Sequence, residues 1–273
     1  MLIISKSNES KLQEIVNLEI MKDLSSVTFT GCQMTNKHIK LLTQKKIRNF
    51  QIGVNHDVEY DCDVRKVSPK LLANLVIHLN SFKMNNSLMS EMTLKQTVAI
   101  LTQLNKKSDV SVSCLEILFN NHFSCIVPDK LASALASVTE LTLVFQKLNF
   151  EKYDALFYQL YKNSRLKTLN LPGNNLSKVN PDLFGSAISK LQRANLSDTN
   201  INREMIENLL EKITRSPPDS QVISELNISH NSQLKHINPK LFAESICRIE
   251  VINLKLSSLT VDQVTCLMNY RHK

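Results

Sequence analysis

One leucine pattern recurs along the chain and constrains the fold more than any other feature. The stretch Leu166–Leu176 reads L-x-x-L-x-L-x-x-N, and the same spacing begins at Ile47, Val112 and Ile223. The pattern follows neither the alternation of a half-buried strand nor the 3.6-residue period of a helix. A recurrent unit of this kind predicts short strands that stack on equivalent strands of neighbouring repeats.

Two kinds of unit alternate, and both predict a strand followed by a helix. In type A, the leucine pattern leads to a segment that begins with proline, whose fixed φ suits the first turn of a helix. In type B, a similar pattern leads to a helix-like segment without that proline. The nine units begin near residues 24, 47, 79, 112, 138, 166, 191, 223 and 249.

The predicted architecture is an α/β solenoid in the form of a horseshoe. Parallel strands line its concave face and helices its convex face, and positions 1, 4 and 6 of each unit point into the core. We expect one repeat domain over residues 24–273, preceded by a partial repeat or cap helix over residues 1–23. Neither end shows a distinct cap, so the terminal helices act as caps or the sequence is part of a longer protein.

Polar residues at fixed positions complete the predicted unit. Asparagine at position 9 of type A can hydrogen-bond the backbone of the turn that leaves the strand. Type B helices carry capping-box spacing at Thr93 with Gln96 and at Thr260 with Gln263. The expected turn asparagines are Asn55, Asn120, Asn174 and Asn231.

The alternation of the two unit types resembles the ribonuclease-inhibitor-like subfamily of leucine-rich repeats. This subfamily includes the repeat domains of NOD-like receptors, and the resemblance covers about residues 24–270. It departs from the subfamily at position 9 of type B, where Cys32 is followed in later units by serine, glutamine, threonine and serine. The resemblance implies a protein-binding repeat domain and, by analogy, a sensing or regulatory role in innate immunity.

Composition argues against several classes of chemistry. Four scattered glycines do not form a phosphate-binding loop, and six cysteines without close pairs do not form a zinc site. The net charge of +8 is spread along the chain, without the basic block of a specific nucleic-acid site. No apolar run is long enough to span a membrane. We therefore expect a cytoplasmic protein that is not an enzyme and binds no cofactor or metal.

The concave face supplies two candidate recognition features. Position 5 of each unit points outward, and its last four occupants are asparagines that either hydrogen-bond across the strands or form a polar recognition strip. Positions 7 and 8 are polar or small in most units but apolar in two neighbouring ones, where the side chains either contact a partner or fold beneath their own loops. The candidates are Asn170, Asn195, Asn227 and Asn253 in the first group, and Leu118, Phe119, Val144 and Phe145 in the second.

An acidic insertion follows the second predicted strand pattern, which begins at Ile47. Its residues Asp57, Glu59 and Asp61 lie in a loop longer than those of the other type A units. The start imitates a calcium-binding loop, but the glycine and the glutamate that such a loop needs are absent. A solvated loop and a loop that contacts a partner remain the two main alternatives.

Together these features favour a scaffold that binds a protein partner on a preformed concave surface. The partner's identity is not encoded in any motif of the chain. Two other classes use related repeats: substrate-recognition subunits of ubiquitin ligases, and GTPase-activating proteins of the RanGAP kind. Both stay open as alternatives at the level of sequence.

Overall fold

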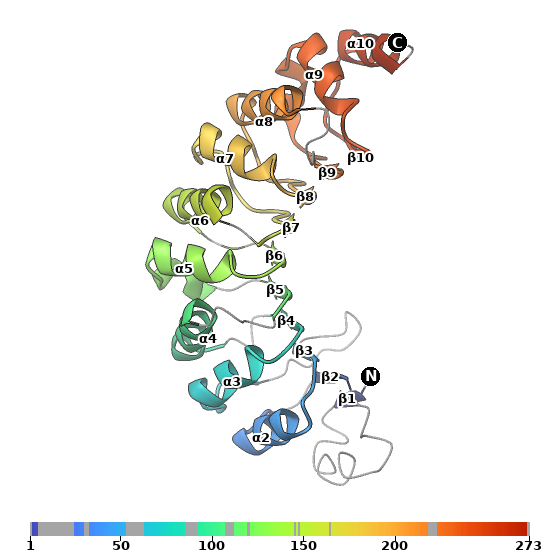
Figure 1. Ribbon diagram of the computed structural model, residues 1–273. Helices are drawn as coiled ribbons and strands as arrows, with labels where there is room; N and C mark the ends of the chain where they lie inside the picture. The colour runs from blue at the N-terminus through green and yellow to red at the C-terminus, as the bar shows by residue number, and fades with distance from the viewer. Residues whose placement is uncertain are drawn as a thin grey trace. The chain divides into compact units, whose positions relative to one another are not determined.

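The computed structural model describes residues 2–4, 25–29, 33–52, 63–85, 92–106, 112–118, 121–144, 146, 148–163, 165–217 and 223–271. The chain divides into two compact units, Met1–Lys147 and Leu148–Lys273. Each unit repeats a strand, a turn and a helix, with strands on one side and helices on the other (Figure 1).

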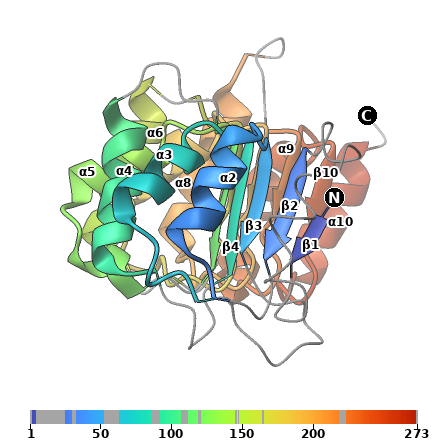
Figure 2. The same cartoon turned by 90° about the horizontal axis from the view of Figure 1, so that it is seen from below.

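In the described part of the first unit, six strands pair in chain order and are all parallel. They are β1 (Leu2–Ile4), β2 (Ser26–Phe29), β3 (Asn49–Ile52), β4 (Ser81–Asn85), β5 (Cys114–Leu118) and β6 (Glu140–Val144). Its helices are α2 (Asn36–Gln44), α3 (Pro69–Val76), α4 (Leu94–Lys106) and α5 (Pro128–Leu135). Figure 2 shows α2, α3 and α4 on one side of β2, β3 and β4.

The second unit continues the same alternation with four parallel strands. They are β7 (Thr168–Asn170), β8 (Arg193–Asn195), β9 (Glu225–Asn227) and β10 (Val251–Asn253). Its helices are α6 (Phe150–Asn163), α7 (Pro181–Ile188), α8 (Arg203–Arg215), α9 (Pro239–Ile246) and α10 (Val261–Arg271). Short 3-10 turns, Asn121–Cys125 in the first unit and Ser232–His236 in the second, lie between strand and helix.

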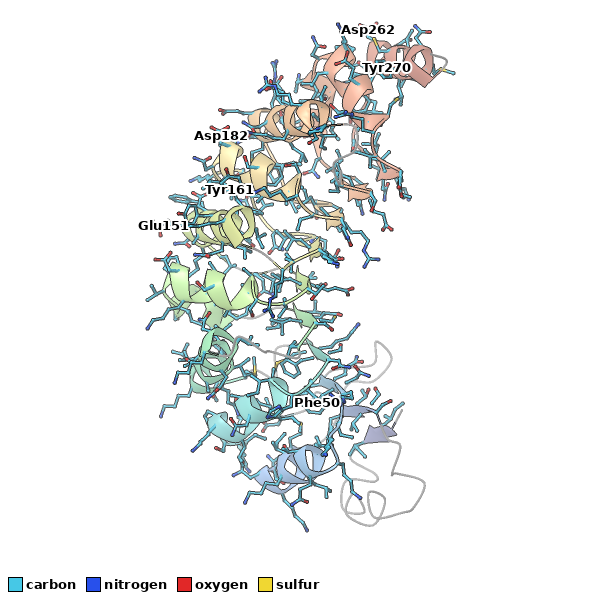
Figure 3. All side chains as sticks on the ribbon, viewed as in Figure 1. Phe50, Glu151, Tyr161, Asp182, Asp262 and Tyr270 are labelled. Carbon is cyan, nitrogen blue, oxygen red and sulfur yellow. The ribbon has the colours of Figure 1, made fainter. Side chains whose placement is uncertain are left out.

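The burial of the leucine positions confirms the register that the sequence predicts. The described residues at positions 1, 4 and 6 are buried in every repeat except the last, where Ile252 and Leu254 are half-buried. In the first unit Phe50 lies between the strand and helix layers (Figure 3), with its ring 6.0 Å from that of Phe82 in the next repeat. Stacking of neighbouring repeats therefore supplies the core, because a single repeat has no second layer to pack against.

The helices also follow the two predicted classes. The four type A helices each span eight residues and begin with proline, whereas type B helices run from 9 to 14 residues. Asn180 and Asn238 cap their helices by accepting backbone N–H groups, while the Ser68 side chain makes no such bond. Both predicted capping boxes are present, because Gln96 and Gln263 each accept the N–H of their capping threonine.

One short strand lies at the start of the chain, where a partial repeat or cap helix was expected over residues 1–23. Leu2–Ile4 is a strand that pairs with β2, and Ile4 is fully buried. Its register places Leu2 opposite Val27 and Ile4 opposite Phe29, so the segment occupies positions 4 to 6 of a further repeat. Residues 5–24 lie outside the described chain.

Candidate functional site

The sheet presents one face away from the helices, which we call the open face. Side chains at positions 3 and 5 of each repeat form it, because strand residues alternate between the two faces. Position 5 is in register from strand to strand within each unit. Its occupants are Thr28, Gln51, Lys83, Glu116 and Thr142 in the first unit, and Asn170, Asn195, Asn227 and Asn253 in the second.

In the first unit an ion pair spans two strands of the open face. The Nζ of Lys83 on β4 lies 2.9 Å from the Oε2 of Glu116 on β5. The hydrogen bond to Glu116 raises the pKa of Lys83. Burial raises the pKa of the neighbouring Cys114 thiol, so this cysteine stays protonated near neutral pH. Both charges of the pair are partly exposed, which makes it a weak contributor to stability.

In the second unit, local turns hold three asparagines in a line across neighbouring strands. We call Asn195, Asn227 and Asn253 the asparagine row. The Oδ1 atoms of Asn195, Asn227 and Asn253 each accept the backbone N–H two residues further on, at 3.1 Å in all three cases. This is the Asx turn that asparagine commonly forms at the end of a strand. No amide hydrogen bond joins these three side chains in the described chain, so of the two alternatives for them, bonding across the strands does not occur. Asn170 differs, because position 7 of its repeat is Pro172, which has no N–H.

The turn after each of these strands contains a left-handed residue at position 8. The four residues are Gly173 (φ 69°), Asp198 (φ 54°), His230 (φ 59°) and Leu256 (φ 56°). Glycine, aspartate and histidine adopt this conformation more readily than leucine does. The Leu256 side chain is also 66% exposed, and Val251 at position 3 of the same repeat is 59% exposed. Neither apolar residue was among the predicted candidates. Position 8 of the last repeat, where leucine replaces a polar or small residue, was the available signal in the sequence.

The apolar candidates are only partly within the described chain. Leu118 on β5 and Val144 on β6 lie opposite each other in the sheet register, and both are half-buried. Phe119 and Phe145 lie outside the described residues. The two described side chains are therefore neighbours, and the partner contact predicted for the group stays a prediction.

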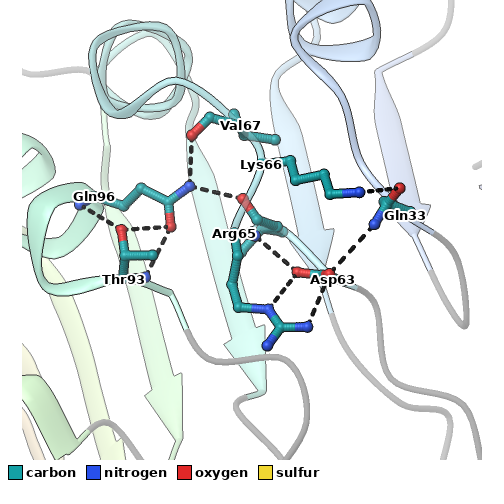
Figure 4. Close-up of polar contacts among 8 residues, drawn as sticks. Gln33, Asp63, Arg65, Lys66, Val67, Thr93 and Gln96 are labelled. Carbon is teal, nitrogen blue, oxygen red and sulfur yellow. Dashed lines mark hydrogen bonds and ion pairs between the residues drawn. The ribbon is translucent and has the colours of Figure 1, made fainter.

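The acidic candidates Asp57, Glu59 and Asp61 also lie outside the described residues, as do the turn residues Asn55 and Asn120. The structure begins again at Asp63, whose carboxylate accepts two hydrogen bonds from the Arg65 guanidinium at 2.9 and 3.0 Å (Figure 4). The hydrogen bonds from Arg65 lower the pKa of Asp63 to about 2.

Further contacts fix the same segment to the repeats on both sides of it. The Asp63 carbonyl accepts the N–H of Met34, and its carboxylate accepts Nε2 of Gln33 at 3.4 Å. On the other side, Nε2 of Gln96 donates to the carbonyls of Val64 and Val67, both at 2.7 Å (Figure 4). The residues that follow the insertion are thus held between two neighbouring repeats.

Position 9 side chains bind backbone carbonyls at the end of the strands. Asn174 donates to the carbonyls of Leu171 and Pro172. Asn231 donates to the carbonyl of Leu196 in the preceding repeat at 2.8 Å, as well as to two carbonyls of its own turn. Both asparagines are buried.

Type B repeats use other residue types for the same contact. Gln146 donates to the carbonyl of Ile117 at 3.0 Å, and Ser257 to that of Ile228 at 3.1 Å, in each case at position 6 of the preceding repeat. Thr199 donates to position 6 of its own repeat at 2.7 Å. The departure from cysteine at position 9 of type B therefore preserves a polar link to the position 6 carbonyl.

These observations decide the fold. Inward residues at positions 1, 4 and 6, a polar turn residue at position 9, and parallel strands each followed by a helix recur through both units. The fold is that of leucine-rich repeats. A solved structure of the leucine-rich repeat-containing protein LegL7 from Legionella pneumophila is similar, with 18% sequence identity and a TM-score of 0.49. The match covers 86% of this chain and 76% of that one.

No protein-family model matches this chain, and no curated protein does. Among the described residues, no group of three or more histidine, cysteine or acidic side chains is placed to hold a metal ion. None of the helices in the described part combines the length and apolar character needed to cross a membrane.

Proposed function

We propose that this leucine-rich-repeat chain is a scaffold that recognises a protein partner on its open face. The observation that carries the proposal is the organisation of that face in the second unit. Identical Asx turns hold three asparagines in register on adjacent strands, and exposed side chains of several chemical types surround them. A surface fixed before binding loses little conformational entropy when a partner docks.

We further propose that the repeats are of the ribonuclease-inhibitor-like kind, with a sensing or regulatory role such as that of NOD-like receptor repeats. The alternation of eight-residue, proline-led helices with longer ones supports the first part of this proposal. The immune role rests on the resemblance of the sequence alone. Neither the ubiquitin-ligase nor the GTPase-regulating alternative gains support from the described residues.

Site-specific photo-crosslinking tests the scaffold proposal. A photoreactive amino acid replaces Gln51 or Glu225, both exposed on the open face, and in matched controls it replaces Lys130 or Glu204, exposed on the helices. After irradiation in cell extract, mass spectrometry identifies the attached proteins.

We expect one partner to be attached from both open-face positions and not from the helix controls. Attachment from the helix controls alone, or the same background proteins from all four positions, would contradict the proposal.

A further inference from the structure

The Asx turns determine which atoms the asparagine row offers to a ligand. A backbone N–H faces one end of the side-chain amide in Asn195, Asn227 and Asn253. Of the two ends of an amide, only the oxygen can accept a hydrogen bond from this N–H. Oδ1 is therefore turned toward the loop in all three residues. Nδ2, with its two N–H donors, is left at the other end of each amide group. The row is consequently a line of hydrogen-bond donors rather than a mixed polar strip.

The surroundings of the row carry no net charge. Arg193 and Lys255 supply positive charges beside it, and Asp198 and Glu225 supply negative ones, all four on exposed residues. Donors in a surface with balanced charge suit neutral acceptors better than carboxylates or phosphates. Main-chain carbonyl oxygens are the most abundant neutral acceptors that a protein partner can present.

The spacing of the donors selects among peptide conformations. Neighbouring parallel strands lie about 4.8 Å apart, so Asn195 and Asn253, two strands apart, are separated by about 10 Å. A polyproline II helix presents equivalent carbonyls every three residues, or about 9 Å, and makes no internal hydrogen bonds that would occupy them. A β-strand repeats every two residues, or about 7 Å, and fits the row less well.

We propose that Asn195 and Asn253 bind main-chain carbonyls one turn apart in a partner segment of polyproline II conformation that crosses strands β8–β10, with Asn227 beneath the residues between them. This inference rests on the proposed function, since it names the chemistry of the partner on the same face. The exposed Val251 and Leu256 beside Asn253 supply apolar contact for proline rings at one end of the segment. Asn170 is not part of the row, because its repeat lacks the N–H that orients the other three.

The variants that test this proposal replace each of the three asparagines with aspartate or with serine. Aspartate keeps an oxygen for the Asx turn but removes the Nδ2 donors. Serine keeps a weaker turn without adding charge, and its one hydroxyl donor, on a shorter side chain, does not reach the position of Nδ2. Both changes therefore separate the donor role from the structural role of the same residue. The matched control is Asn175→Asp, an exposed asparagine of the second unit that lies outside the row.

The measurement is fluorescence anisotropy of a labelled ten-residue polyproline peptide titrated with the full chain. We expect saturable binding that weakens at least tenfold in the triple Asp variant and in the triple Ser variant, and is unchanged in Asn175→Asp. A labelled Gly-Ser peptide of the same length should bind at least tenfold more weakly, because it is not pre-ordered. Circular dichroism melts verify that the variants remain folded.

Equal binding of polyproline to wild type and to both triple variants would overturn the inference, as would the absence of binding to wild type. In either case, open-face crosslinks from Gln51 and Glu225 would leave the scaffold proposal standing. If those crosslinks are also absent, the proposed function fails together with the inference.

Discussion

Replacing Asn231 with alanine should strongly destabilise the second unit, because its side chain makes several buried hydrogen bonds. Its Nδ2 donates to the carbonyls of Leu196, Ile228 and Ser229 at 2.8, 3.2 and 3.2 Å. Its Oδ1 accepts the N–H of Ile201 at 3.3 Å, and the residue is 1% exposed. One side chain thus connects its own turn to two segments of the preceding repeat.

The magnitude follows from counting the donors and acceptors. The two N–H groups of Nδ2 and one lone pair of Oδ1 provide about three hydrogen bonds, each worth roughly 1 kcal/mol net. Alanine also leaves the Ile201 N–H buried without its partner, which adds to the cost. We expect the free energy of unfolding to fall by about 3 kcal/mol or slightly more.

Thr199→Val is the matched control, because Thr199 occupies position 9 of the preceding repeat. Its Oγ1 donates to the Leu196 carbonyl of its own repeat at 2.7 Å. We expect a loss of about 1 kcal/mol. Asn231→Thr should recover part of the stability, since a threonine at position 9 can donate to the position 6 carbonyl of its own repeat, as Thr199 does.

Urea denaturation followed by circular dichroism gives the midpoint and slope for each variant. The slopes should stay equal, so that shifts in midpoint report stability. If Asn231→Ala proves no more destabilising than Thr199→Val, the claim that Asn231 links neighbouring repeats is refuted.

Three further predictions concern other parts of the fold. Tyr153→Phe should raise stability by about 1 kcal/mol in thermal melts, because the buried hydroxyl has no hydrogen-bond partner among the described residues; lower stability would reveal a missed partner. Gly185→Ala should destabilise by about 1–3 kcal/mol despite the better helix propensity of alanine, because an added Cβ would lie 3.0 Å from the α8 backbone; Ser186→Ala on the same helix is the control, and an equal effect of the two would contradict the close approach. Asp63→Asn should lower stability at neutral pH, since the pKa of about 2 lies below the ordinary value of 3.8 and the carboxylate therefore stabilises the fold above that ordinary value. In thermal melts, the stability difference between Asp63→Asn and wild type should disappear as the pH falls from about 5 to 2. A stability difference that does not change with pH would exclude the ion pair with Arg65 as its cause.

The repeat architecture could be predicted because its main determinant is local. A fixed leucine spacing decides which side chains point inward, and proline marks where each type A helix begins. The strand Leu2–Ile4 could not be recognised in this way, since three apolar residues carry no period. Its assignment depends on pairing with β2, which is a contact between segments distant in sequence.

The details of the candidate site were less predictable, for two physical reasons. Position 9 of type B looked irregular because Gln146, Thr199 and Ser257 differ in identity, although all three donate to a position 6 carbonyl. The asparagine row was recognised, but the two alternatives considered for it, bonding across the strands and a polar recognition strip, did not include a local turn. The competing Asx turn uses an N–H only two residues away, and a local partner of this kind requires no neighbouring strand.

The central claim is that the open face is the recognition surface. The most direct test is the affinity of this chain for the partner that photo-crosslinking identifies. Calorimetric titration of that purified partner would compare wild type with the open-face variants Gln51→Arg and Glu225→Arg and the helix variants Lys130→Glu and Glu204→Arg. We predict that the dissociation constant rises about tenfold or more for the open-face pair and less than about twofold for the helix pair. The reverse ranking would contradict the claim.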